Sequence, residues 1–151
     1  MKNRKDYNRY YKKRNVLLAG IMSALLLVGC GAVKNETDNS TSEGVQKLTA
    51  QQAYEKIESG DPVVIVDVRT KEEYNAGHIK DAILIPNEEI KDEKPELLPV
   101  EDAEILVYCR SGNRSAQAAE KLKKMGYSKV YDFGGINDWT YGTVDTPWEE
   151  K

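Results

Sequence analysis

The chain of 151 residues contains only two cysteines and one histidine. Cys30 lies in a predicted export signal, described below, so Cys109 has no partner for a disulfide bond. An unpaired thiol outside the cytoplasm is exposed to oxidation, which leaves two interpretations of Cys109: a buried apolar residue or a reactive group. Nothing in the sequence indicates a metal ion or an organic cofactor, and the domain contains no internal repeat.

Long apolar runs are also absent. The run from Val16 to Gly29 covers about fourteen residues, fewer than the ~20 that a membrane-spanning helix needs. Seven Lys and Arg among the first fifteen residues precede it, an order typical of a secretory signal. The run ends in Leu27-Val28-Gly29-Cys30, which resembles the bacterial lipoprotein box, in which the cysteine is acylated and becomes the new N-terminus.

This resemblance predicts a signal peptide over residues 1–29, a lipid anchor on Cys30 and attachment to the extracytoplasmic face of the bacterial membrane. An uncleaved N-terminal anchor is the alternative, and it places the body of the chain on the same side of the membrane. Residues 30–46 comprise the acylated cysteine and a polar segment without apolar periodicity, which indicates a flexible tether. Residues 47–151 are predicted to form the folded domain.

The basic residues belong to the leader and not to the domain. The first fifteen residues carry a single acid, Asp6, so the net charge of −3 corresponds to about −9 over the remainder of the chain. An acidic domain without a basic stripe interleaved with aromatic residues offers little to a phosphate backbone, so we expect no binding to nucleic acid.

Strand and helix patterns alternate through the domain. Capping boxes at Thr49-Ala50-Gln51-Gln52 and Thr70-Lys71-Glu72-Glu73 open two helices, and 116–125 shows an amphipathic helical pattern. The segment 87–99 is limited by prolines to one or two helical turns. Expected strands are 63–66, 82–85, 105–108 and 129–132; a turn follows at Gly134-Gly135, then a short helix, 136–141, whose Trp139 and Tyr141 should pack in the core. This alternation predicts an α/β fold with a mostly parallel sheet and helices on both faces.

The segment from Cys109 to Ser115 has the most distinctive composition. It joins a predicted strand to a predicted helix, so its backbone N–H groups should converge above the helix N-terminus. These groups and the guanidinium groups of Arg110 and Arg114 would stabilise a Cys109 thiolate. Ser111, Gly112, Asn113 and Ser115 add amides, hydroxyls and backbone freedom. The pattern predicts a thiolate that attacks sulfur, phosphorus or arsenic in a small anion.

Four segments together resemble the single-domain rhodanese-like sulfurtransferases. These segments are Asp67-Val68-Arg69, Glu73-Tyr74-Asn75-Ala76-Gly77-His78-Ile79, Cys109-Arg110-Ser111-Gly112-Asn113-Arg114-Ser115, and Gly134-Gly135-Ile136-Asn137-Asp138-Trp139. The resemblance implies a rhodanese-like fold and a Cys109 persulfide, formed from an anionic donor such as thiosulfate or a persulfide and passed to cyanide or a thiol. Residues 110–115 would bind the donor, Asp67 and Arg69 would brace the loops, His78 would make a structural hydrogen bond, and the protein would be a monomer.

Two alternatives remain open. One is a non-catalytic module that carries or binds sulfur, since a fold alone does not fix a function. The other is a phosphatase or arsenate reductase. Four residues separate Cys109 from Arg114, whereas the related dual-specificity phosphatases and arsenate reductases carry a loop that is one residue longer. The shorter loop suits a single sulfur atom better than a tetrahedral oxyanion.

Overall fold

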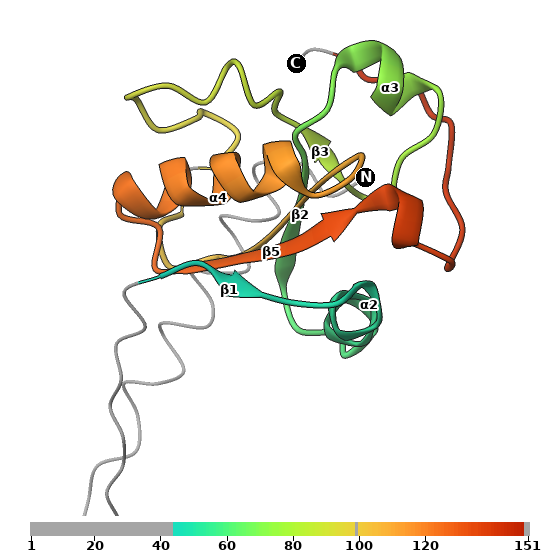
Figure 1. Ribbon diagram of the computed structural model, residues 1–151, viewed down its shortest axis with the longest axis horizontal. Coiled ribbons are helices and arrows are strands. Elements are labelled where there is room, and N and C mark those ends of the chain that lie inside the picture. Colours follow the sequence, from blue (N-terminus) through green and yellow to red (C-terminus); the bar gives the residue numbers. More distant parts are fainter. Residues whose placement is uncertain (1–43, 99, 150–151) are drawn as a thin grey trace, which may run out of the picture. The chain divides into compact units, whose positions relative to one another are not determined.

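The computed structural model describes residues 44–98 and 100–149, which belong to one compact unit, 42–151. Its five-stranded sheet is parallel throughout, with the order β1-β5-β4-β2-β3 (Figure 1). The predicted fold class is confirmed. Along the chain the elements are β1 (Gln46–Lys47), α2 (Ala50–Glu58), β2 (Val63–Asp67), α3 (Lys71–Asn75), β3 (Ile83–Leu84), β4 (Glu104–Cys109), α4 (Asn113–Lys124), β5 (Lys129–Gly135) and the 3₁₀ turn η1 (Ile136–Asp138).

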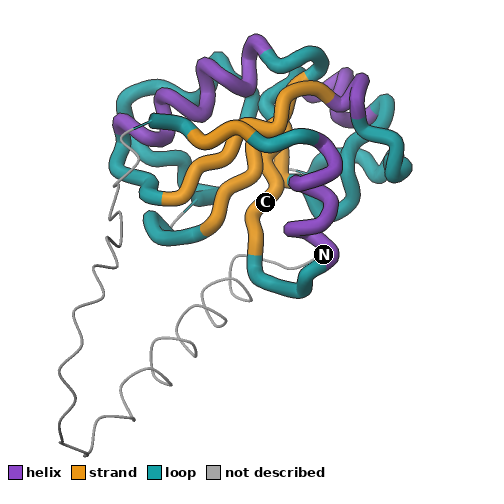
Figure 2. Tube along the Cα trace, turned by 60° about the horizontal axis from the view of Figure 1, so that its bottom comes forward, coloured by secondary structure: helices purple, strands orange, loops and turns teal. Residues whose placement is uncertain are grey.

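The central strands β2 and β4 carry continuous apolar runs, 63–66 and 105–108, because both of their faces are covered. Leu106 and Tyr108 of β4 belong to a buried cluster that includes Ala53 of α2 and Phe133 of β5. Val107, the residue between them, points to the opposite face. On that face α4 packs against β4 and β5 through Ala118, Ala119 and Leu122. Figures 1 and 2 show α2 and α4 on opposite sides of the sheet.

Both predicted capping boxes are present. At α2 the Thr49 hydroxyl accepts from the Gln52 N–H (3.2 Å), and the Gln52 side chain accepts in return from the Thr49 N–H (2.9 Å). At α3 Thr70 and Glu73 make the same two contacts, at 3.3 and 3.1 Å. Each box satisfies two N–H groups that a helix start leaves without intrahelical partners.

Three local predictions are wrong. Gly134-Gly135 is not a turn, since β5 continues to Gly135, which pairs with Cys109 of β4. The expected helix 136–141 is reduced to η1, and Tyr141 is 40% exposed, stacked on Tyr54 instead of buried. Within 87–98 the chain forms turns and no helix.

The predicted signal peptide, Cys30 and the tether as far as residue 43 lie outside the described residues. Gln46, assigned from the sequence to the tether, lies in β1 and pairs with Tyr131 of β5. Within residues 44–98 and 100–149, no helix combines the length and apolar character needed to cross a membrane.

Candidate active site

Cys109 ends β4, and its sulfur lies inside the turn that leads into α4. The Gly112 N–H donates to Sγ at 3.1 Å, and the Ser115 hydroxyl oxygen lies 3.7 Å from it. Cys109 and Ser115 are both buried, with 1% and 0% of their surfaces exposed. Gly112 stands at the N-cap of α4 with φ of 100°, a left-handed conformation that favours glycine. The fold therefore holds the sulfur at the N-terminus of α4, as the sequence predicts.

The surroundings of the sulfur favour its thiolate. Burial raises the pKa of the Cys109 thiol, but the N–H groups of Ser115, Ser111 and Gly112 and the Ser115 hydroxyl outweigh burial, so the pKa lies below its ordinary value. Donors aimed at the charged form stabilise that form, and the positive end of the α4 dipole acts in the same direction. A thiolate is the nucleophilic form of cysteine.

Removal of the Ser115 hydroxyl should make Cys109 less acidic. In Ser115→Ala the pKa of Cys109 is expected to rise, because one of the groups that lower it is gone. The rate of alkylation by iodoacetamide, measured against pH, should then reach its half-maximum at a higher pH than in the parent chain. Ser128→Ala, at an exposed position after α4, is the control. An unchanged profile in Ser115→Ala would assign stabilisation of the thiolate to the backbone alone.

Gly135, at the end of β5, lies directly against the loop that follows Cys109. A Cβ added to Gly135 would lie 2.4 Å from the carbonyl oxygen of Arg110 and 2.8 Å from Cα of Ser111, distances that no side chain tolerates. The Ser115 hydroxyl also lies within hydrogen-bond distance of the Gly134 carbonyl, at 3.2 Å. The absence of a side chain at Gly135 therefore lets β5 approach the loop closely, which a turn prediction does not explain.

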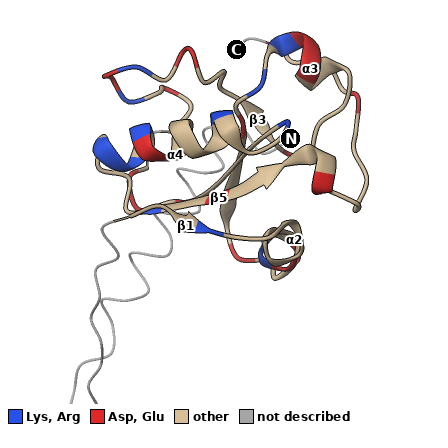
Figure 3. Cartoon of the chain, in the orientation of Figure 1, with Lys and Arg blue, Asp and Glu red and all other residues tan. Residues whose placement is uncertain are grey.

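The two arginines of the loop have different environments. Arg110 is exposed and forms no ion pair with the residues that the structure describes, so its charge is available at the rim of the site. Arg114, in the first turn of α4, forms a bidentate ion pair with Glu73 of α3, with Nη1–Oε2 at 2.7 Å and Nη2–Oε1 at 2.8 Å. The acidic first turn of α3 is red in Figure 3, and Glu73 links it to the basic first turn of α4. Ser111 and Asn113 are exposed beside them.

The Glu73–Arg114 pair should give the fold an acid-sensitive contribution. The Arg114 hydrogen bonds lower the pKa of Glu73 from 4.5 to about 2. A carboxyl with a depressed folded-state pKa stabilises the fold fully above its unfolded pKa, and the contribution is lost as the pH falls through the folded value. Urea unfolding should therefore show that parent and Glu73→Gln differ in stability above pH 4.5 and converge towards pH 2. A constant difference would contradict this assignment.

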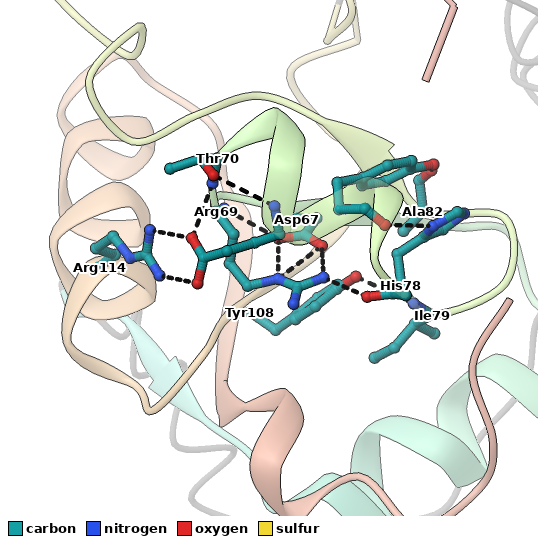
Figure 4. A network of polar contacts seen from close by, with 11 residues as sticks. Asp67, Arg69, Thr70, His78, Ile79, Ala82, Tyr108 and Arg114 are labelled. Carbon is teal, nitrogen blue, oxygen red and sulfur yellow. Dashed lines mark hydrogen bonds and ion pairs between the residues drawn. The ribbon is translucent and has the colours of Figure 1, made fainter. Parts of the chain in front are cut away.

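Asp67 and Arg69 form a buried brace at the end of β2 (Figure 4). Arg69 Nη2 donates to Asp67 Oδ2 (2.6 Å) and to the Gly77 carbonyl (2.7 Å), and Arg69 Nε reaches both carboxylate oxygens. Tyr108 accepts from the Ile79 N–H through its hydroxyl (3.1 Å). Burial, together with the Asp67 carboxylate, raises the pKa of Tyr108. The brace thus ties β2 and β4 to the chain that leaves α3.

His78 lies in the same region but away from the sulfur. Its Nδ1 is 3.0 Å from the Tyr74 carbonyl, its ring stacks on Tyr74 at 3.6 Å, and its backbone pairs with Val144. Trp148, to which we could assign no function from the sequence, packs edge-on against Tyr74, and its backbone N–H donates to Asn75 Oδ1. These contacts fix the C-terminal segment to α3 and indicate a structural function for His78.

The structure thus brings Cys109, Gly112 and Ser115 together with the Ser111 amide, turns Arg114 towards Glu73, and places Asp67, Arg69 and His78 in a supporting layer. Sequence reasoning missed the contributions of Glu73, Tyr108 and Gly135, although Glu73 and Gly135 lie in motifs that it singled out. In the described part of the chain, no group of three or more His, Cys, Asp or Glu side chains could hold a metal ion.

Comparison with known proteins agrees with this geometry. The protein-family model of the rhodanese-like domain matches residues 49–141 of this chain. This range includes β4 and α4, which flank the Cys109 loop. The chain belongs to the rhodanese-like family. The solved rhodanese-like domain protein from Staphylococcus aureus aligns with it at a TM-score of 0.60 and 32% identity, over 68% of this chain and 99% of that one.

Two bacterial relatives have names that state a function. Thiosulfate sulfurtransferase PspE of Escherichia coli is 40% identical over 48% of this chain and 70% of its own length. Putative sulfur carrier protein YrkF of Bacillus subtilis is 34% identical over 70% of this chain and 56% of its own length. This chain therefore spans little more than half of YrkF. The rhodanese domain described here is homologous to sulfurtransferases.

Proposed function

We propose that this rhodanese domain is a sulfurtransferase that carries sulfane sulfur on Cys109. The observation that supports this function best is the buried sulfur of Cys109 at the start of α4, with the Gly112 N–H at 3.1 Å and a pKa below its ordinary value. The loop offers a nucleophile and a set of N–H donors around one atom. The same donors hold the pKa of Cys109 below its ordinary value, so the thiolate forms more readily than in a free cysteine.

The reaction has two steps. The Cys109 thiolate attacks the outer sulfur of thiosulfate, the S–S bond of the donor breaks, and sulfite leaves with the electron pair; with a persulfide donor, a thiolate leaves instead. The new Cys109 persulfide lies among the N–H groups of the loop, which stabilise its negative terminal sulfur. Cyanide or an acceptor thiolate then attacks that outer sulfur. The S–S bond to Cys109 breaks, the Cys109 thiolate leaves with the electron pair, and the product is thiocyanate or an acceptor persulfide.

Arsenate or phosphate chemistry receives less support. An oxyanion centred over the loop would need the arginine that closes it, and in this fold both terminal nitrogens of Arg114 are engaged by Glu73.

A non-catalytic sulfur carrier is the second candidate, and the similarity to the putative sulfur carrier protein YrkF favours it. Mass spectrometry distinguishes the two. After incubation with thiosulfate, the chain should gain about 32 Da on Cys109, and added cyanide should remove that mass with repeated turnover if the protein is an enzyme. Loading without turnover would support the carrier, and the absence of loading with every sulfane donor would contradict both.

We also propose that Cys30 is the acylated N-terminus of the mature protein and holds the domain at the extracytoplasmic face of the membrane. The support is the Leu27-Val28-Gly29-Cys30 motif after a basic and apolar leader. In cells, the parent chain should partition with membranes and incorporate a labelled fatty acid. Cys30→Ala should incorporate no label. A labelled Cys30→Ala chain would contradict acylation at this residue.

A further inference from the structure

The charge at the mouth of the site is lower than the loop sequence implies. Arg110 and Arg114 supply two positive charges within six residues of sequence. The structure pairs Arg114 with Glu73 through both terminal nitrogens, and the side chains of the pair are 27% and 28% exposed. An ion pair of this geometry presents little net charge to a ligand, which leaves Arg110 as the uncompensated cation of the loop.

The charge of Arg114 is nevertheless close enough to matter at Cys109. Arg114 lies two residues after Gly112, whose N–H contacts the sulfur. Its guanidinium and the Cys109 thiolate affect each other, because the negative charges of Glu73, Cys109 and Glu88 all raise the pKa of Arg114. Among these groups Glu73 has the largest effect, because its carboxylate accepts from both terminal nitrogens of Arg114.

The carboxylate of Glu73 is not required for its other contact. Glu73 also accepts from the Thr70 N–H in the capping box of α3. At α2, the neutral side chain of Gln52 makes the same contact with Thr49, at 2.9 Å. A neutral glutamine therefore makes the same cap contact in this chain, and the cap does not need the negative charge at position 73. The contact that uses this charge is the ion pair with Arg114.

We propose that Glu73 is a specificity-determining residue: by neutralising Arg114 it directs the Cys109 site towards singly charged persulfide donors and away from doubly charged thiosulfate. This inference rests on the proposed sulfur transfer and narrows its donor class. A donor with two negative charges gains twice as much electrostatic free energy from an added cation as a donor with one. Neutralisation of Arg114 therefore weakens thiosulfate more than a monoanionic persulfide.

Glu73→Gln tests the proposal because it keeps the cap and removes the charge. A unit charge a few ångströms away in water changes affinity by about fourfold per charge of the donor. The ratio of kcat/KM for thiosulfate to kcat/KM for 2-hydroxyethyl persulfide should thus rise about fourfold in Glu73→Gln. In Glu73→Gln/Arg114→Gln the ratio should return to the parent value. Glu55→Gln on the exposed face of α2 removes an equal charge far from the loop and should leave the ratio unchanged.

A second measurement does not depend on sulfur transfer. In the full chain carrying Cys30→Ala, Cys109 is the sole thiol, so alkylation by iodoacetate, a monoanion, and by neutral iodoacetamide reports the potential at its sulfur. The rate with iodoacetate divided by the rate with iodoacetamide should rise about fourfold in Glu73→Gln. Effects on the acidity of Cys109 cancel in this ratio because both reagents react with the same thiolate.

The outcomes separate the two proposals. Sulfur transfer with both ratios unchanged or lowered in Glu73→Gln would overturn the inference and leave the function intact; a lowered thiosulfate ratio would mean that Glu73 positions Arg114 for the donor. A raised alkylation ratio without transfer from any donor would reject the function and uphold charge selection at Cys109. A ratio that stays raised in the double variant would contradict the neutralisation of Arg114.

Discussion

Cys109→Ser is expected to reduce the formation of thiocyanate from thiosulfate and cyanide by at least ~10³-fold, because it removes the nucleophile. A serine hydroxyl stays protonated beside the N–H groups that stabilise the Cys109 thiolate, and it forms no persulfide. Serine keeps the shape of cysteine with a smaller terminal atom, so we expect Gly112 and Ser115 to stay in place around it. The loss should therefore appear in catalysis and not in folding.

The measurement is thiocyanate release by the purified chain, with thermal unfolding recorded in parallel. Ser128→Ala, an exposed serine far along the chain from the loop, should retain the parent rate within about twofold. Cys109→Ser should also fail to gain the mass of one sulfur atom when it is incubated with thiosulfate. Residual turnover above about a tenth of the parent rate would mean that Cys109 is not the atom that carries sulfur.

The elements that the sequence predicts well are those decided by neighbouring residues. The capping boxes at Thr49 and Thr70 need only a hydroxyl and a Glu or Gln three residues later, so both helix starts are correct. The apolar runs of β2 and β4 are predicted within one residue at each end, because burial on both faces leaves no room for polar positions. The loop at Cys109 follows from the same local order of strand, glycine and helix.

The structural role of Gly135 could not be predicted from its neighbours in the sequence. Two adjacent glycines favour a turn, and Gly134 does adopt a positive φ of 84°. Gly135, however, has an ordinary extended conformation, with φ of −115°. It must be glycine because the Arg110 carbonyl occupies the place of a side chain. That carbonyl lies 25 positions earlier in the chain, so no pattern around Gly135 could reveal it.

The ion-pair partner of Arg114 could not be predicted from neighbouring residues either. Its spacing from Cys109 marks it as a loop arginine, but its partner lies 41 positions earlier, on α3. The sequence contains 25 acidic residues, and nothing near Arg114 selects Glu73 among them. The charge of the loop therefore depends on a tertiary contact that the sequence motif does not record.

Burial should decide the cost of breaking an ion pair in this domain. The pairs Asp67–Arg69 and Lys56–Glu104 have the same N–O distance, 2.6 Å, but differ in environment. The side chains of the first pair are 0% and 7% exposed, whereas those of the second are each about a quarter exposed. We expect Asp67→Ala to lower the free energy of unfolding by about 3–5 kcal/mol, since it leaves the Arg69 charge buried with only the Gly77 carbonyl as acceptor.

Glu104→Ala is the matched control and should cost about 1 kcal/mol or less, because water replaces the lost partner of Lys56. Urea unfolding of both variants gives the comparison directly. The double variant Asp67→Ala/Arg69→Ala should recover part of the loss, since it removes the unpaired charge together with its partner. Equal costs for Asp67→Ala and Glu104→Ala would mean that water reaches the Asp67–Arg69 pair, and would contradict the assignment of this pair to the buried interior.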